Sequence, residues 1–125
     1  MILIVDDYSE LGGVLERYVR VFGCKGHCLT DATKVLETVE QLRPSLLFLD
    51  DEMPCISGLE VLRLLRESPQ PDIASLPVVM FSAATLSVRH AEAAQLGALA
   101  WVMKHDSLTK LDPFIKQYGR SSTEA

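Results

Sequence analysis

Short apolar runs alternate with longer amphipathic stretches along this chain, and each apolar run stops at a polar, charged or glycine residue. The runs are consecutive rather than alternating, which indicates strands buried on both faces, as in a parallel sheet covered by helices. Strands are predicted at residues 2–5, 25–29, 46–49, 77–81 and 98–103. The second of these runs is the weakest, and we expect it at an edge of the sheet.

Apolar residues recur at helical spacing between the predicted strands, and capping residues set the expected helix bounds. The expected helices run from Asp7 or Ser9 to Gly23, from Thr30 or Asp31 to Pro44, from Ser57 or Gly58 to Glu67, from Thr85 to Leu96, and from Asp112 to Tyr118. Residues 68–72 are proline-rich and polar and are expected to form a loop. Pro113 would break a helix interior, so we expect Asp112 as N-cap and Pro113 at the first helical position.

The alternation of strand and helix predicts right-handed βαβ units and an α/β domain with helices on both faces of the sheet. A chain of 125 residues that is 48% hydrophobic can bury a core without disulfides or metals. We expect one domain over residues 1–119 and a tail over residues 120–125. Cys24, Cys28 and Cys55 are odd in number and lack framework spacing, so we expect free thiols.

Charge and hydropathy exclude two classes of partner. The formal net charge of −5 repels a phosphate backbone, and no cluster of lysine and arginine offers a local exception. No apolar run approaches the roughly 18 residues that a membrane-spanning helix needs, and the N-terminus lacks the basic region of a signal peptide. We therefore expect a cytoplasmic protein that binds neither nucleic acid nor a membrane.

Chemically reactive residues stand at the carboxyl ends of four predicted strands. Asp6 and Asp7 follow the first strand, Asp50 the third, Ser82 the fourth and Lys104 the fifth. Parallel strands place their carboxyl ends at one edge of the sheet, so these groups should converge. Clustered carboxylates either raise a pKa or hold a cation, and an all-oxygen set suits Mg²⁺. With a lysine and a hydroxyl nearby, the pattern indicates phosphate chemistry with a carboxylate as nucleophile.

The order and spacing of these residues resemble the receiver domain of two-component response regulators, over almost the whole chain. The resemblance rests on residues 2–7, residues 47–54 with Asp50 three places before Met53 and four before Pro54, Gly58, residues 77–83, Gly97, Ala98, Trp101 and Lys104. It implies a flavodoxin-like (βα)5 fold, a doubly wound parallel sheet with strand order 2-1-3-4-5. It also implies a signalling protein rather than an enzyme.

The resemblance implies a role for each residue at the strand ends. Asp50 matches the phosphoacceptor. Asp7 and Asp50 would ligate Mg²⁺ directly, Asp6 would act through water, and the backbone carbonyl of Glu52 would complete the set. Lys104 would pair with the phosphoryl group or, before phosphorylation, with Asp50.

The resemblance further implies a switch and a set of partners. Ser82 would swing toward the phosphoryl group, and Trp101, where the family usually has Tyr or Phe, would fill the vacated space. The alternative is a tryptophan ring held permanently in place, because the larger ring resists rotamer exchange. The phosphodonor would be a histidine kinase or histidine phosphotransfer protein, the output an unknown downstream protein, and the chain a monomer or a phosphorylation-dependent dimer.

Three positions near the phosphoacceptor need separate expectations. His105 stands where most family members have a proline, which leaves open whether the bond from Lys104 is cis. Cys55 occupies a place where the family often has glycine, which should stiffen the turn. Asp51 should point away from Asp50, because side chains alternate along a strand, and we expect a solvated loop carboxylate.

Two other functions stay open at this stage. A pseudo-receiver that is not phosphorylated and acts as a protein-interaction module is motivated by His105 and Trp101. A haloacid-dehalogenase-like phosphatase also forms an aspartyl phosphate, but it requires Asp-x-Asp after its strand. This chain has Glu52 two residues after Asp50 and no cap domain within 125 residues, which disfavours the phosphatase.

Overall fold

The sheet is parallel throughout and has the strand order β2-β1-β3-β4-β5, which confirms the predicted topology. The computed structural model describes residues 1–83 and 88–120. The strands are β1 (Ile2–Val5), β2 (Gly26–Leu29), β3 (Leu46–Leu49), β4 (Val78–Ser82) and β5 (Ala100–Met103). Because β1 pairs with both β2 and β3, the chain reverses its direction of travel across the sheet at β1. A reversal of this kind marks the ligand-binding crevice in doubly wound folds.

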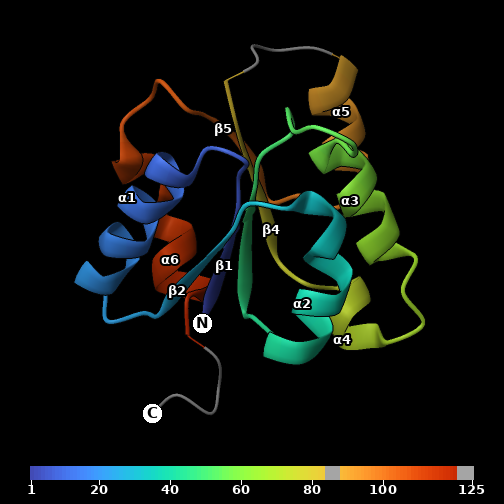
Figure 1. The fold of residues 1–125 in the computed structure, drawn as a ribbon, viewed down its shortest axis with the longest axis horizontal. Helices are drawn as coiled ribbons and strands as arrows, with labels where there is room; N and C mark the ends of the chain where they lie inside the picture. The colour runs from blue at the N-terminus through green and yellow to red at the C-terminus, as the bar shows by residue number, and fades with distance from the viewer. Residues whose placement is uncertain (84–87, 121–125) are drawn as a thin grey trace.

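Helices cover both faces of the sheet (Figure 1). On one face lie α1 (Ser9–Val21) and α6 (Asp112–Tyr118), and on the other lie α2 (Val35–Leu42), α3 (Gly58–Arg66), α4 (Pro71–Ala74) and α5 (Val88–Gln95). Two 3₁₀ turns, η1 (Ala32–Lys34) and η2 (Leu108–Leu111), lead into α2 and α6. The predicted helix start at Thr85 and residues 121–125 of the predicted tail lie outside the described residues. Within the described ranges, no helix has the length and apolar character needed to cross a membrane.

Some helix boundaries differ from those predicted. The expected loop over residues 68–72 is partly helical, because Pro71 begins α4 and proline is favourable in a first turn. The N-cap of α1 is Tyr8, whereas Asp7 or Ser9 was predicted. Asp112 is the first residue of α6 rather than its N-cap, since η2 runs directly into the helix. Its carboxylate accepts a hydrogen bond of 2.6 Å from the Tyr18 hydroxyl instead.

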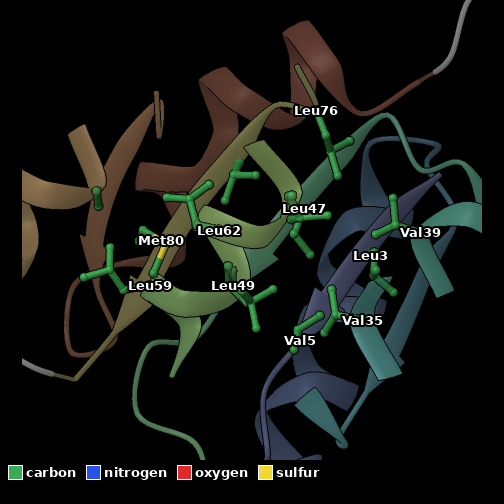
Figure 2. Packing of buried hydrophobic residues seen from close by; sticks show 14 of the residues in the cluster. Leu3, Val5, Val35, Val39, Leu47, Leu49, Leu59, Leu62, Leu76 and Met80 are labelled. Carbon is green, nitrogen blue, oxygen red and sulfur yellow. The ribbon is translucent and has the colours of Figure 1, made fainter. Parts of the chain in front are cut away.

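Two apolar clusters, one on each face of the sheet, hold the layers together. Strands β1, β3 and β4 are buried at every position, which explains their continuous apolar sequences. Figure 2 shows one cluster, whose labelled members are Leu3, Val5, Val35, Val39, Leu47, Leu49, Leu59, Leu62, Leu76 and Met80. Complete burial of each large apolar side chain contributes about 2 kcal/mol. The strand β2 lies at an edge of the sheet, as predicted, and is only partly buried.

Arg66, near the end of α3, ties several segments together through backbone carbonyls. Its Nε donates to the carbonyl of Leu96 at 2.6 Å, and its Nη2 donates to the carbonyl of Gly97 at 3.3 Å. Its Nη1 donates to the carbonyls of Ala74 and Leu76 at 3.0 and 2.9 Å. One guanidinium group therefore fixes both the chain just after α5 and the connection from α4 to β4.

Candidate functional site

The reactive residues predicted from the sequence stand at the shared carboxyl edge of the sheet. Strand pairing continues past the ends of the strands, and this continuation holds the site residues in register. The Asp50 N–H donates to the Val5 carbonyl at 2.9 Å, and the Lys104 N–H donates to the Ser82 carbonyl at 2.8 Å. The strands β1, β3, β4 and β5 thus bring Asp6, Asp50, Ser82 and Lys104 to the same edge of the sheet.

Three carboxylates converge at this edge. Asp6, Asp7 and Asp50 each present an oxygen, and these oxygens lie within 4.8 Å of one another. Asp6 and Asp50 are buried, whereas Asp7 is exposed. The Oδ1 atom of Asp6 accepts a hydrogen bond of 2.9 Å from the Tyr8 N–H. Two buried carboxylates this close repel each other strongly unless a cation or a proton offsets their charge.

Lys104 supplies part of the compensating charge. Its Nζ atom lies 2.7 Å from Asp6 Oδ2 and 3.3 Å from Asp50 Oδ2. The expected pairing with Asp50 is therefore present, and the contact with Asp6 is the shorter of the two. Burial alone would lower the pKa of Lys104, but the close contact with Asp6 and the charges of both carboxylates hold that pKa above its ordinary value. The lysine is thus an ammonium ion at neutral pH.

The buried position of Asp50 changes its acidity. Burial raises the pKa of Asp50 to about 6, the Asp6 charge adds to the rise, and Lys104 opposes it. The Glu52 N–H, 3.4 Å from Asp50 Oδ1, also opposes the rise, and the Glu52 side chain is exposed. At neutral pH Asp50 is mainly ionised, so it is a carboxylate held in a pocket that disfavours its charge.

The carboxylate cluster fits a hard divalent cation such as Mg²⁺. Its donors are all oxygens, which Mg²⁺ prefers, and one of the three carboxylates is open to solvent. The Oδ2 atom of Asp6 is buried and accepts no hydrogen bond of good geometry within the described ranges, although Lys104 Nζ lies close to it. A buried oxygen in this state leaves acceptor capacity for a metal-bound water.

Asp51 does not match its expected state, because it is a buried residue with an ionic partner and not a solvated loop carboxylate. Its side chain does point away from Asp50, but it meets the guanidinium of Arg89 on α5 there. Burial alone would raise the pKa of Asp51, but Arg89 and the Leu59 N–H hold it below its usual range. Arg89 lies far away in sequence, and no local signal marks it as this partner.

Gly58 allows the chain to leave the site. A Cβ atom at this position would lie 2.1 Å from the carbonyl oxygen of Asp50 and 2.9 Å from the Cα atom of Asp51. Only glycine therefore permits α3 to begin this close to the end of β3. The side chain of Ser57 caps the helix by accepting a hydrogen bond of 3.2 Å from the Glu60 N–H.

The two residues predicted to form a switch occupy neighbouring strands. Ser82 is fully buried at the end of β4, and Trp101 is partly buried on β5. The Trp101 ring packs edge-on against His90 of α5, with the ring centroids 5.7 Å apart and an interplanar angle of 84°. Both rings line a cavity of about 160 Å³ between α5 and β5. The sequence does not reveal the contribution of His90.

The two departures from the family pattern have simple structural outcomes. The peptide bond between Lys104 and His105 is trans, and His105 is exposed. Cys55 is also exposed and has a φ of 75°, a left-handed conformation that favours glycine. Neither change displaces Lys104 from the carboxylates.

Comparison with known proteins agrees with this geometry. The response regulator receiver domain model matches residues 2–116. The DNA-binding response regulator MtrA of Mycobacterium tuberculosis (strain ATCC 25618 / H37Rv) is 34% identical over 103 residues, which are 82% of this chain and 43% of that protein. The response regulator protein TmoT of Ectopseudomonas mendocina is 37% identical over 82 residues, which are 66% of this chain and 36% of that protein. The chain thus spans less than half the length of these curated relatives.

Solved structures show the same fold. The BeF3-activated N-terminal receiver domain of Klebsiella pneumoniae RstA superposes with a TM-score of 0.83 at 21% identity, covering 96% of this chain and 98% of that one. The chemotaxis protein CheY4 of Vibrio cholerae gives a TM-score of 0.82 at 20% identity, covering 94% and 96%. From the family match over residues 2–116, together with the sheet order, the chain belongs to the response regulator receiver domain family.

Proposed function

We propose that this chain is the phosphoacceptor receiver of a two-component or phosphorelay system. A histidine kinase or histidine phosphotransfer protein would donate a phosphoryl group to Asp50 in a Mg²⁺-dependent step. The observation that carries the proposal is the buried Asp50 carboxylate, with Lys104 Nζ 3.3 Å away and two further carboxylates beside it. A nucleophile, a cation and a set of metal ligands are thus present in one pocket.

The residues of the pocket have separate parts in this reaction. An Asp50 oxygen attacks the phosphorus atom of a phosphohistidine, the bond from phosphorus to the imidazole nitrogen breaks, and the imidazole leaves. With a pKa of about 6, Asp50 is ionised at neutral pH and needs no base to become a nucleophile. Lys104 offsets the charge of the phosphoryl oxygens, and it already lies in the pocket. The Ser82 hydroxyl donates a further hydrogen bond.

The metal ligands proposed here are those expected from the resemblance. Asp7 and Asp50 would hold Mg²⁺ directly, Asp6 would hold it through water, and the Glu52 carbonyl would complete the protein's share. A bound Mg²⁺ supplies neutralisation of phosphoryl charge. The spare acceptor capacity of Asp6 and the exposure of Asp7 support this assignment.

Phosphorylation would be reported on the face formed by α5 and β5. Movement of Ser82 toward the phosphoryl group would vacate space beside Trp101, and the ring would then exchange its contact with His90 for that space. The receiving partner would be a downstream protein that docks on this face, or a second copy in a phosphorylation-dependent dimer. We place the receiver unit within residues 1–119 and the protein in the cytoplasm.

Mass spectrometry after incubation with acetyl phosphate and MgCl₂ tests the proposal. The wild-type chain should gain one phosphoryl group, and Asp50→Asn should gain none. Asp51→Asn, which removes the adjacent carboxylate instead, is the matched control and should still be modified. An undiminished gain in Asp50→Asn would refute the assignment of the acceptor. A wild-type chain modified neither by acetyl phosphate nor by a phosphorylated kinase would favour the pseudo-receiver alternative.

A further inference from the structure

Asp51, the residue next to the proposed phosphoacceptor, forms an ion pair with Arg89 of α5. Arg89 Nε lies 2.5 Å from Asp51 Oδ2, and Arg89 Nη2 lies 2.8 Å from Asp51 Oδ1. The Asp51 side chain is 2% exposed and that of Arg89 is 43% exposed. A two-point contact of this kind fixes both the distance and the orientation of the two groups, which a single hydrogen bond does not.

Asp51 also holds the start of α3. Its Oδ1 atom accepts a hydrogen bond of 3.0 Å from the Leu59 N–H, and its backbone carbonyl accepts one of 3.0 Å from the Gly58 N–H. The residue after Asp50 is therefore attached to the first turn of α3 and, through Arg89, to α5. A displacement of the Asp50–Asp51 backbone would act on both helices.

The burial of Asp51 requires a cationic partner. The Asp51 side chain is 2% exposed, and a buried carboxylate is strongly destabilising when its ion-pair partner is removed. Arg89 supplies the positive charge, so the pair fixes α5 relative to the residue next to Asp50.

The residue after Arg89 continues the connection to the surface. His90 makes the edge-on ring contact with Trp101, which lies on a different strand from Asp50. The route runs from Asp50 to its neighbour Asp51, across the ion pair to Arg89, and through His90 to the Trp101 ring. It is separate from the route through Ser82.

We propose that the Asp51–Arg89 ion pair is a positioning contact that couples the phosphoacceptor pocket to α5 and to Trp101. The proposal rests on the phosphorylation of Asp50 proposed above. A phosphoryl group adds charge and bulk at Asp50, the Asp51 backbone adjusts, and the two-point contact carries the start of α5 with it. Without the pair, Asp50 can still be phosphorylated, but Trp101 no longer reports the event fully.

The first experiment measures the coupling without any phosphoryl group. Amide hydrogen exchange is followed in the wild type, Arg89→Gln, Asp51→Asn and the double variant. Each single variant should raise the exchange rate several-fold both in α5 and in residues 51–61, and the double variant should add little more. An Arg89→Gln variant that loosens α5 alone, with residues 51–61 unchanged, would overturn the proposal.

The second experiment adds beryllofluoride and MgCl₂, with ¹⁹F NMR to measure binding and Trp101 fluorescence to measure the response. Trp101 is the chain's only tryptophan, so the signal has one source. Arg89→Gln should bind beryllofluoride but lose most of the fluorescence change, and Arg89→Lys should recover part of it. An Arg89→Gln variant with the full wild-type fluorescence change would overturn the proposal.

Arg63 provides the matched control. It lies on α3 and faces Glu92 of α5 at 3.9 Å, so Arg63→Gln also removes an arginine between these helices but leaves Asp51 untouched. This variant should keep the wild-type fluorescence change, and an equal loss in both variants would count against a specific role for Arg89. If the wild type binds no beryllofluoride, the proposed phosphorylation fails, whereas the exchange experiment still decides whether the ion pair couples the two segments.

Discussion

Replacement of the proposed phosphoacceptor should stabilise the metal-free fold. Asp50→Asn removes a charge that the pocket disfavours and keeps nearly the same shape. The pKa of Asp50 is about 6 in the folded chain, against an ordinary value of 3.8. Since a tenfold change in ionisation corresponds to 1.4 kcal/mol, holding this carboxylate ionised costs about 3 kcal/mol. The asparagine variant should recover between about 1 and 3 kcal/mol, because its amide also needs hydrogen-bond partners.

The sign of the pH dependence follows from the raised pKa. Below the ordinary value, Asp50 is protonated in both the folded and the unfolded chain and costs nothing. As the pH rises from 3.8 to about 6, the unfolded chain loses its proton first, so wild-type stability falls over this range and then levels off. The variant lacks this contribution. The difference in stability between the two proteins should therefore be near zero below pH 3.8 and reach its full size above about pH 6.

Urea denaturation followed by circular dichroism, in EDTA and at several pH values, measures this difference. Asp51→Asn is the control with the opposite expected sign, because the pKa of Asp51 is lowered and the substitution breaks its buried ion pair with Arg89. Added MgCl₂ should raise the stability of the wild type at neutral pH and have little effect on Asp50→Asn. The reasoning would be refuted if Asp50→Asn were no more stable than the wild type at neutral pH, or if the difference did not change with pH.

Three further predictions concern the surroundings of the pocket. Lys104→Met should destabilise the metal-free protein by about 3 kcal/mol in urea denaturation, because two buried carboxylates lose the cation that pairs with them. Added MgCl₂ should restore part of the lost stability. Wild-type stability of this variant in EDTA would contradict the prediction. Gly58→Ala should cost about 2 kcal/mol and slow modification by acetyl phosphate, because its Cβ displaces the Asp50 carbonyl; an unchanged unfolding midpoint would count against the close approach. Cys55→Gly should gain about 0.5 kcal/mol by relieving the left-handed backbone, with Cys55→Ala unchanged as the control; equal effects of both variants would show that the thiol matters instead.

Much of the fold follows from local pattern. The central strands are apolar at consecutive positions because helices cover both of their faces, and that property can be read without knowing the partners of each residue. Sequence order alone does not fix the order of strands in a sheet, and here the resemblance to a known family supplied it. The short α4 was missed because Pro71 is as compatible with a loop as with a first helical turn.

The part of the site that consists of residues at strand ends was predictable from the sequence. Parallel strands bring Asp6, Asp50, Ser82 and Lys104 together whatever the loops do. The environment of Asp51 was not predictable in the same way. Alternation along the strand correctly indicated the direction of the Asp51 side chain. The burial of this side chain, however, depends on Arg89 of α5, which reaches it only once the chain has folded. Pairings between distant residues of this kind leave no periodic signal.

The contacts of Arg66 set how α5 can move. They hold the chain at Leu96 and Gly97, just beyond one end of the helix, while near the other end Arg89 pairs with Asp51, in the loop that follows the phosphoacceptor strand. The eight residues of α5 that the structure describes span about 12 Å, so a tilt of about 5° about the held end displaces the other end of this segment by about 1 Å. In such a tilt, α5 would rotate about the segment at Gly97, which Arg66 holds in place. Such a tilt would displace Arg89 and His90 most, because they lie near the end of α5 that is farthest from Gly97, and it would change the contact between His90 and Trp101.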